Sequence, residues 1–313
     1  MFGCGPFGMS GHDNPFSYAW FIKNILKQLA SQAVVWYELT QYSSLERASV
    51  DYRTSNKAAW EEVFEHRKPG WGDDIPARLK QSKLACFDSD LKATLESMNF
   101  EGKTVAHFFC NNGRELLSLM GLGVSSGVGF DFAENILEQA RSTAEKAGIK
   151  NCSFVLCDVL EIPPRYYGQF DVVLFTIGGI IWIEDLVLLF EQVGKCLKDT
   201  GLVLINDGHP FLWMLPLPEE DDFDENHLNR VTNSYFRKEP WVENNGMEYL
   251  AGAYDSKTFT SFVHTLGDVI NALSANGMKT VRLSEYDHDI GMGGEVYDGS
   301  GFPLSYILIA EKG

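Results

Sequence analysis

Short apolar runs alternate with stretches of helical periodicity between residues 104 and 206, and this alternation constrains the fold more than any other feature. The runs are apolar on both faces, as strands are in a parallel sheet that helices cover on both sides. The expected strands are Thr104–Phe109, Ser125–Phe130, Ser153–Leu156, Phe170–Phe175 and Leu202–Asn206, and the expected helices are Gly113–Met120, Ala133–Ala147 and Ile183–Leu197. This order predicts a doubly wound α/β sheet.

The alternation stops after Asn206. Proline and acidic residues dominate 216–225, and three later segments alternate polar and apolar residues as antiparallel strands do. These segments are Thr232–Phe236, Met247–Tyr254 and Lys257–His264. We therefore predict a strand-rich insertion after the fifth strand, residues 212–264, that covers the functional site. A helix at Leu266–Asn276 and strands at Thr280–Glu285 and Leu304–Ala310 close the chain.

Residues 1–100 follow a different pattern and are predicted to form a tail and a helical cap ahead of the main domain, residues 101–313. The first ten residues are rich in Gly and Phe and show no periodicity. Apolar residues recur at helical spacing in Tyr18–Tyr37 and again in Ser55–His66. The first of these helices could bind a membrane surface or a partner, but a cap packed on the main domain is the simpler interpretation.

The charge of the chain bears on its partners. A formal net charge of −17 repels phosphate backbones and anionic lipid headgroups, so nucleic acid is a poor candidate substrate. The six cysteines form no CxxC pair, which is typical of reduced thiols in a cytosolic protein. Neither a membrane-spanning run nor a secretory signal is evident. We expect a cytoplasmic protein, and the sequence does not indicate its oligomeric state.

The loop after the first strand is a candidate ligand site. It lies within Val105–Glu115 and enters the next helix at Gly113. A tight turn from a strand into a helix N-terminus presents backbone N–H groups to a polar or anionic ligand, and glycine permits close approach. With one glycine the loop is also compatible with a plain strand-to-helix turn.

Carboxylates follow the next two strands. Asp131 stands eighteen residues after Gly113, where a carboxylate can accept hydrogen bonds from both hydroxyls of a ribose. Asp158 follows the third strand, and with Val159 it could meet an adenine ring and its amino group. The alternatives are a helix N-cap for Asp131 and a turn carboxylate for Asp158.

Together these positions resemble the class I S-adenosylmethionine (SAM) dependent methyltransferases of the small-molecule branch, over roughly Asn56 to Lys312. The resemblance implies a seven-stranded, mostly parallel Rossmann-like sheet with an antiparallel last strand, SAM as cofactor and a small-molecule methyl acceptor. The family's loop has several glycines, whereas this chain has Cys110-Asn111-Asn112-Gly113.

The resemblance also implies roles for individual residues. Trp60 matches a tryptophan often found near the cofactor, although packing of the cap helix explains it equally well. Cofactor contacts fall in three groups: the methionine part at Phe109, Cys110, Asn111 and Gly113; the nucleoside at Asp131, Phe132, Asp158 and Val159; and the end of the fourth strand at Thr176 and Ile177.

A methyl acceptor that loses a proton needs a base, and the candidates are His209 and His264. Each could equally be a structural histidine. Tyr235 and Tyr254, in the insertion, could line the acceptor pocket with Trp60 or simply pack the insertion on the core. We predict no metal site within Glu285–Asp289, because side chains on adjacent positions cannot all face one ion.

Two other functions remain open. A nicotinamide-dependent oxidoreductase would also use Asp131 for a ribose, but it requires G-x-G-x-x-G where this loop has only Gly113. A SAM-binding protein without catalysis would account for the irregular loop and the additional N-terminal helix.

Overall fold

The computed structural model describes residues 52–313. The predicted tail and the predicted helix at Tyr18–Tyr37 lie outside the described residues. Within the described part of the chain, no helix has the length and apolar character needed to cross a membrane.

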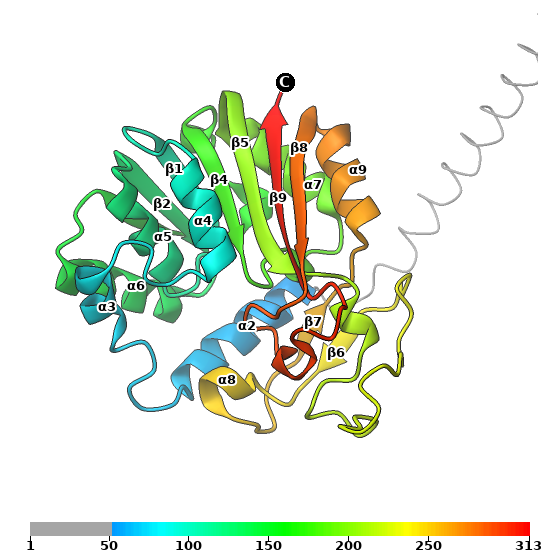
Figure 1. Cartoon of the computed structure of the whole chain (residues 1–313). Helices are drawn as coiled ribbons and strands as arrows, with labels where there is room; N and C mark the ends of the chain where they lie inside the picture. Colours follow the sequence, from blue (N-terminus) through cyan, green and yellow to red (C-terminus); the bar gives the residue numbers. More distant parts are fainter. Residues whose placement is uncertain (1–51) are drawn as a thin grey trace, which may run out of the picture. The chain divides into compact units, whose positions relative to one another are not determined.

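A seven-stranded sheet forms the centre of the described chain, in the order β3-β2-β1-β4-β5-β9-β8 (Figure 1). The strands β3, β2, β1, β4 and β5 are parallel, and β9 is antiparallel to both of its neighbours. This confirms the predicted doubly wound sheet with an antiparallel last strand. The strands are β1 Thr104–Phe108, β2 Ser126–Asp131, β3 Cys152–Leu156, β4 Phe170–Thr176, β5 Leu197–Gly208, β8 Met278–Tyr286 and β9 Ser305–Lys312.

Helices cover both faces of the sheet because the strands are apolar on both faces. The helices α7 (Leu186–Cys196) and α9 (Leu266–Ala275) pack on one face, around core residues such as Phe175 and Leu308. The helices α4 (Ser89–Ser97), α5 (Arg114–Leu119) and α6 (Glu134–Ala147) pack on the other, around residues such as Leu174. All the predicted helices of the main domain are present.

The carboxyl ends of the parallel strands are covered by α2 (Tyr52–Glu65) and by part of the insertion (Figure 1). Asn56 of α2 joins them: its side-chain amide donates to the Thr260 carbonyl at 2.8 Å and accepts from the Thr260 N–H at 2.7 Å. Because Asn56 is buried and pairs with the backbone of β7 (Phe259–Ser261), it fixes α2 against the insertion. A further helix, α3 (Ile75–Gln81), connects this region to α4.

The insertion has less strand than the sequence predicts. Its only described ladder is a ribbon of β6 (Trp241–Glu243) and β7. The segment Thr232–Phe236 is not a strand, and Met247–Tyr254 contains the short helix α8 (Glu248–Ala251), so both predictions are wrong. Alternation of polar and apolar residues over a few positions does not distinguish a strand from one helical turn. In α8 the exposed Tyr249 is followed by the buried Leu250, so the sequence alternates although the backbone is helical.

Candidate functional site

The loop between β1 and α5 is a tight turn with an unusual backbone. Phe109, Asn111 and Gly113 all have positive φ, at 56°, 48° and 73°. Such a conformation is strained for the first two residues and natural for glycine. A Cβ at Gly113 would lie 2.5 Å from the Phe154 ring, so only glycine fits there. The side chain of Cys110 is buried, and burial raises the pKa of its thiol well above the usual range, so this residue can offer a ligand only its backbone.

Asp131 holds this loop from the end of β2. Its Oδ2 accepts from the Asn111 N–H at 2.9 Å, and its Oδ1 accepts from the N–H groups of Phe132 and Ala133 at 2.8 and 3.2 Å. The N-cap of α6 is Ala133, so Asp131 is not a helix cap. Burial raises the pKa of its carboxyl to about 6. A carboxylate has about four acceptor positions, which leaves one for a ligand hydroxyl.

Asp158 has two partners. Its Oδ1 accepts from the Leu160 N–H at 2.8 Å and caps the 3₁₀ turn Val159–Glu161, as the turn interpretation expects. Its Oδ2 pairs with Arg53 of α2 at 2.9 Å. This ion pair fixes α2 beside the end of β3. Val159 is buried in the core, whereas Phe132 is half-buried and packs near α2.

The segment after β4 is fixed by two polar groups that the sequence analysis missed. Thr176 shares a hydrogen bond with Nε2 of the buried His107 at 2.9 Å, and burial lowers the pKa of that imidazole to about 4, so it is neutral. Ile177 has a φ of 30° and donates its N–H to a carbonyl of β5. Asp207, at the end of β5, accepts from the N–H groups of Gly178 and Gly208 at 2.7 and 2.8 Å.

Asp207 is a buried carboxylate with one oxygen, Oδ2, that has no hydrogen-bond partner among the described residues. Burial raises the pKa of Asp207 to about 6. The sequence could have indicated this residue, because Asp207 follows a predicted apolar strand in the same way as Asp131. The segment 176–180 is therefore held in place by a charge whose burial costs stability.

The two candidate histidines differ in their free nitrogens. His209 has Nδ1 accepting from the Phe211 N–H at 3.0 Å, so its proton lies on Nε2, which donates to Glu285 at 2.9 Å. His264 donates from Nε2 to the Ile183 carbonyl at 2.8 Å. Within residues 52–313 no hydrogen bond reaches its Nδ1. Burial lowers the pKa of both imidazoles, so both favour the neutral form.

The three candidate aromatic residues take part in packing. Trp60 is buried, with its ring edge-on to Trp182 and Phe259 at 5.5 and 5.6 Å between centroids. The hydroxyl of Tyr235 accepts from the first N–H of α9 at 3.3 Å. The ring of Tyr254 stacks on the ring of His66, which directly follows α2, with 4.7 Å between the ring centroids.

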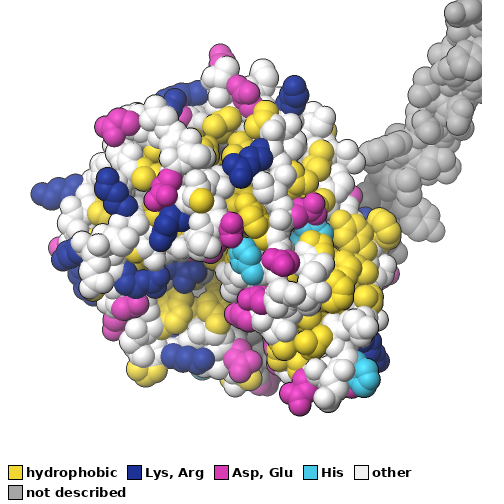
Figure 2. All heavy atoms as spheres, in the orientation of Figure 1, with side chains coloured by type: hydrophobic (Ala, Val, Ile, Leu, Met, Phe, Trp, Pro, Cys, Tyr) yellow, Lys and Arg dark blue, Asp and Glu magenta, His cyan; other side chains and the backbone are white. Residues whose placement is uncertain are grey.

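The surface is hollowed between α4 and the edge formed by α2 and α8, with hydrophobic side chains inside and both basic and acidic ones along the rim (Figure 2). This hollow lies at the carboxyl ends of the parallel strands, where ligands bind in open α/β sheets.

The chain is similar to known methyltransferases in sequence and in fold. Residues 99–253 match a family of methyltransferase domains. A demethylmenaquinone methyltransferase from Lactococcus lactis is 31% identical over 115 residues, which is 36% of this chain and 44% of the relative. The chain thus spans less than half the length of that curated relative.

Solved structures share the fold. A candidate SAM-dependent methyltransferase from Listeria monocytogenes aligns with a TM-score of 0.56 at 18% identity, over 71% of this chain and 97% of the other. A SAM-dependent methyltransferase from Mesorhizobium loti aligns with a TM-score of 0.51 at 17% identity, over 70% and 96%.

Proposed function

Because the chain belongs to the class I SAM-dependent methyltransferases, we propose that it transfers the methyl group of SAM to a small-molecule acceptor. The observation that carries the proposal is the pairing of Asp131 with the strained loop at Phe109–Gly113. A carboxylate that fixes the loop and keeps one acceptor position free suits a cofactor with a ribose beside a charged tail.

The cofactor would extend along the carboxyl ends of β1, β2 and β4. The methionine part would lie on the backbone of Phe109–Gly113, and the ribose would bind the remaining acceptor position of Asp131. Phe132, which is half-buried, would lie against the adenine, whereas Val159 is buried in the core and would offer its backbone. Since Arg53 occupies Oδ2 of Asp158, the adenine amino group would share that carboxylate with the ion pair. Thr176 and Ile177 would border the sulfonium end.

When bound, SAM supplies a methyl group already activated on a sulfonium. The protein must hold the acceptor in line with the S–CH₃ bond and exclude water, and positioning can contribute roughly 7–11 kcal/mol to such a step. The segment 176–180, which is fixed by Asp207 and His107, would border the reacting atoms on one side. Where the acceptor must lose a proton, His264 is the better base of the two histidines, because its Nδ1 is available.

A small acceptor is supported by the curated relative, whose name gives demethylmenaquinone as its substrate. The insertion also favours it, because α2 and β7 close over the strand ends through Asn56. The chain's acidic charge further argues against a phosphate-rich acceptor.

The test is transfer of a labelled methyl group. The protein is incubated with methyl-labelled SAM and either reduced demethylmenaquinone or a metabolite extract. We expect a labelled small molecule whose formation S-adenosylhomocysteine (SAH) inhibits. Tight SAH binding with no labelled product from any acceptor would favour the SAM-binding protein without catalysis.

A further inference from the structure

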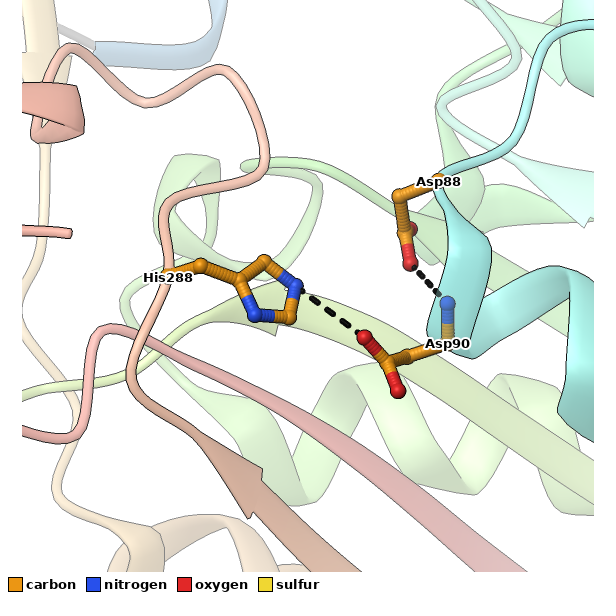
Figure 3. A group of neighbouring side chains, drawn as sticks. All are labelled: Asp88, Asp90 and His288. Carbon is orange, nitrogen blue, oxygen red and sulfur yellow. Dashed lines mark hydrogen bonds and ion pairs between the residues drawn. The ribbon is translucent and has the colours of Figure 1, made fainter. Parts of the chain in front are cut away.

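Three metal-capable side chains converge at the start of α4. Asp88 and Asp90 flank the first residue of the helix, and His288 approaches from the segment after β8 (Figure 3). The Nε2 atom of His288 lies 3.4 Å from Oδ2 of Asp90. One ligand atom from each of the three side chains lies within 4.8 Å of the other two. Ligand atoms on opposite sides of one ion are about 4.0–4.4 Å apart, so small side-chain movements would complete a site.

Helix capping explains only part of this arrangement. Asp88 caps α4 with Oδ1, which accepts from the N–H groups of Asp90 and Leu91, both at 2.9 Å. The cap leaves Oδ2 of Asp88 free of the helix. Asp90 makes no cap bond with its side chain. Two carboxylate oxygens and an imidazole nitrogen therefore face one another without a structural requirement of the helix.

An independent observation comes from the sheet behind the cluster. Asn206, near the end of β5, is 2% exposed, and its Nδ2 lies 3.4 Å from Oδ2 of Asp88. Its Oδ1 is buried without a hydrogen-bond partner among the described residues. A buried amide oxygen without a partner costs about 1–3 kcal/mol. Because the two ends of a carboxamide are nearly isosteric, rotation of this group brings Oδ1 to the position facing Asp88.

Rotation without a cation would set Oδ1 of Asn206 against a carboxylate oxygen. With a cation between them, the two carboxylates, the imidazole and Oδ1 of Asn206 would all bind the ion, in exchange for the long contact of 3.4 Å between Nδ2 and Asp88. We propose that Asp88, Asp90, His288 and Asn206 bind a divalent cation. Mixed imidazole and oxygen ligands suit Zn²⁺, Mn²⁺ or Co²⁺ better than Ca²⁺, which takes oxygen ligands alone.

The site is open on one side. The side chains of Asp90 and His288 are 38% and 29% exposed, whereas Asn206 forms a buried back wall. An ion can therefore enter from solvent, and its remaining positions face outward for water or a ligand oxygen. The sequence predicts no metal site formed within Glu285–Asp289, and only His288 of that stretch takes part here. The other ligands come from α4 and β5.

The ion would lie beside the proposed acceptor position. Asn206 pairs in register with Thr176, which borders the sulfonium end of the proposed cofactor site. An oxygen of the acceptor could complete the coordination of the ion. This role rests on the proposed function, whereas cation binding itself does not.

Mn²⁺ binding tests the proposal. The electron paramagnetic resonance signal of free Mn²⁺ is followed as protein is added, and calorimetry with Zn²⁺ and Co²⁺ gives the stoichiometry. We expect one site per chain and a loss of affinity of at least about tenfold in Asp90→Asn and His288→Ala. Asn206→Ala should weaken binding by a similar factor.

His227→Ala is the matched control, because His227 and Asp224 form an exposed pair at 2.7 Å outside this cluster. Absence of any bound cation in the wild-type protein, or equal affinity in His288→Ala and His227→Ala, would overturn the proposal. SAH is titrated into the same samples without metal. His288→Ala should keep wild-type SAH affinity, which shows that it is folded. A failure of SAH to bind the wild type would contradict the proposed function and leave the cation result standing.

Discussion

Asp207→Asn isolates the cost of the buried charge that holds the segment after β4. The substituted amide keeps an oxygen where Oδ1 accepts from Gly178 and Gly208. Its nitrogen replaces Oδ2, which has no partner among the described residues. The variant thus keeps the hydrogen bonds from Gly178 and Gly208 and removes the ionisation.

The pKa of Asp207 fixes the sign and size of the effect. Burial raises it from 3.8 to about 6, so between these pH values the folded state binds more protons than the unfolded state. The wild-type free energy of unfolding therefore falls as pH rises through this window. A shift of about two units corresponds to about 3 kcal/mol, of which about 2 kcal/mol develops between about pH 4 and pH 7. Asparagine does not titrate, so any cost of its amide is the same at every pH.

Urea unfolding followed by circular dichroism measures the effect. We expect the stability of Asp207→Asn, relative to wild type, to rise by about 2 kcal/mol from about pH 4 to pH 7. Asp199→Asn, at an exposed position of the same strand, is the control for replacing an aspartate. Parallel pH profiles for wild type and Asp207→Asn would refute the argument that the charge is buried at a cost.

Two further predictions concern the loop and the base. Gly113→Ala should lower the free energy of unfolding by about 1–3 kcal/mol more than Gly148→Ala, because both positions have positive φ but only Gly113 has the Phe154 ring against a new Cβ. Equal losses of unfolding free energy in the two variants, measured by urea unfolding, would show that the Phe154 ring moves aside at no cost and would contradict this prediction. For an acceptor that loses a proton, His264→Ala should lower kcat by about 10²–10⁴-fold, while His209→Ala should act mainly on stability. Steady-state rates at several pH values measure this, and a larger loss of kcat in His209→Ala would reverse the assignment.

The sheet was predictable because its signal is local. Each parallel strand contains a short apolar run, and the runs of β1, β2, β4 and β5 are largely buried, whereas only the centre of β3, at the edge of the sheet, is buried. The structure places all five strands within a few residues of the expected bounds except for the start of β5. Asp131 was predicted as a site residue for the same reason, since it ends such a run. Its bond to the Asn111 N–H spans 20 positions and depends on the backbone turn of the loop, which no periodicity indicates.

The remaining features depend on contacts distant in sequence. Arg53 and Asp158 are 105 positions apart, and nothing near either residue indicates the other. The same is true of Asp88, at the start of α4, and His288, after β8, which come together only in the folded chain. The strands of the insertion were predicted incorrectly for another reason. A ladder of three residues per strand, such as that of β6 and β7, is too short to produce a reliable alternation of polar and apolar residues.

Calorimetric titration with SAH tests the central claim most directly. The wild-type protein should bind one SAH and no NAD. Asp131→Asn should bind SAH about 10- to 150-fold more weakly, since a hydrogen bond to a charged group contributes about 1.5–3 kcal/mol. Asp171→Asn is the matched control. Asp171 also accepts a hydrogen bond from a backbone N–H, at 2.9 Å, but it lies at the amino end of β4, away from the proposed cofactor site. SAH affinity that is equal in Asp131→Asn and wild type, or binding of NAD in its place, would contradict the account.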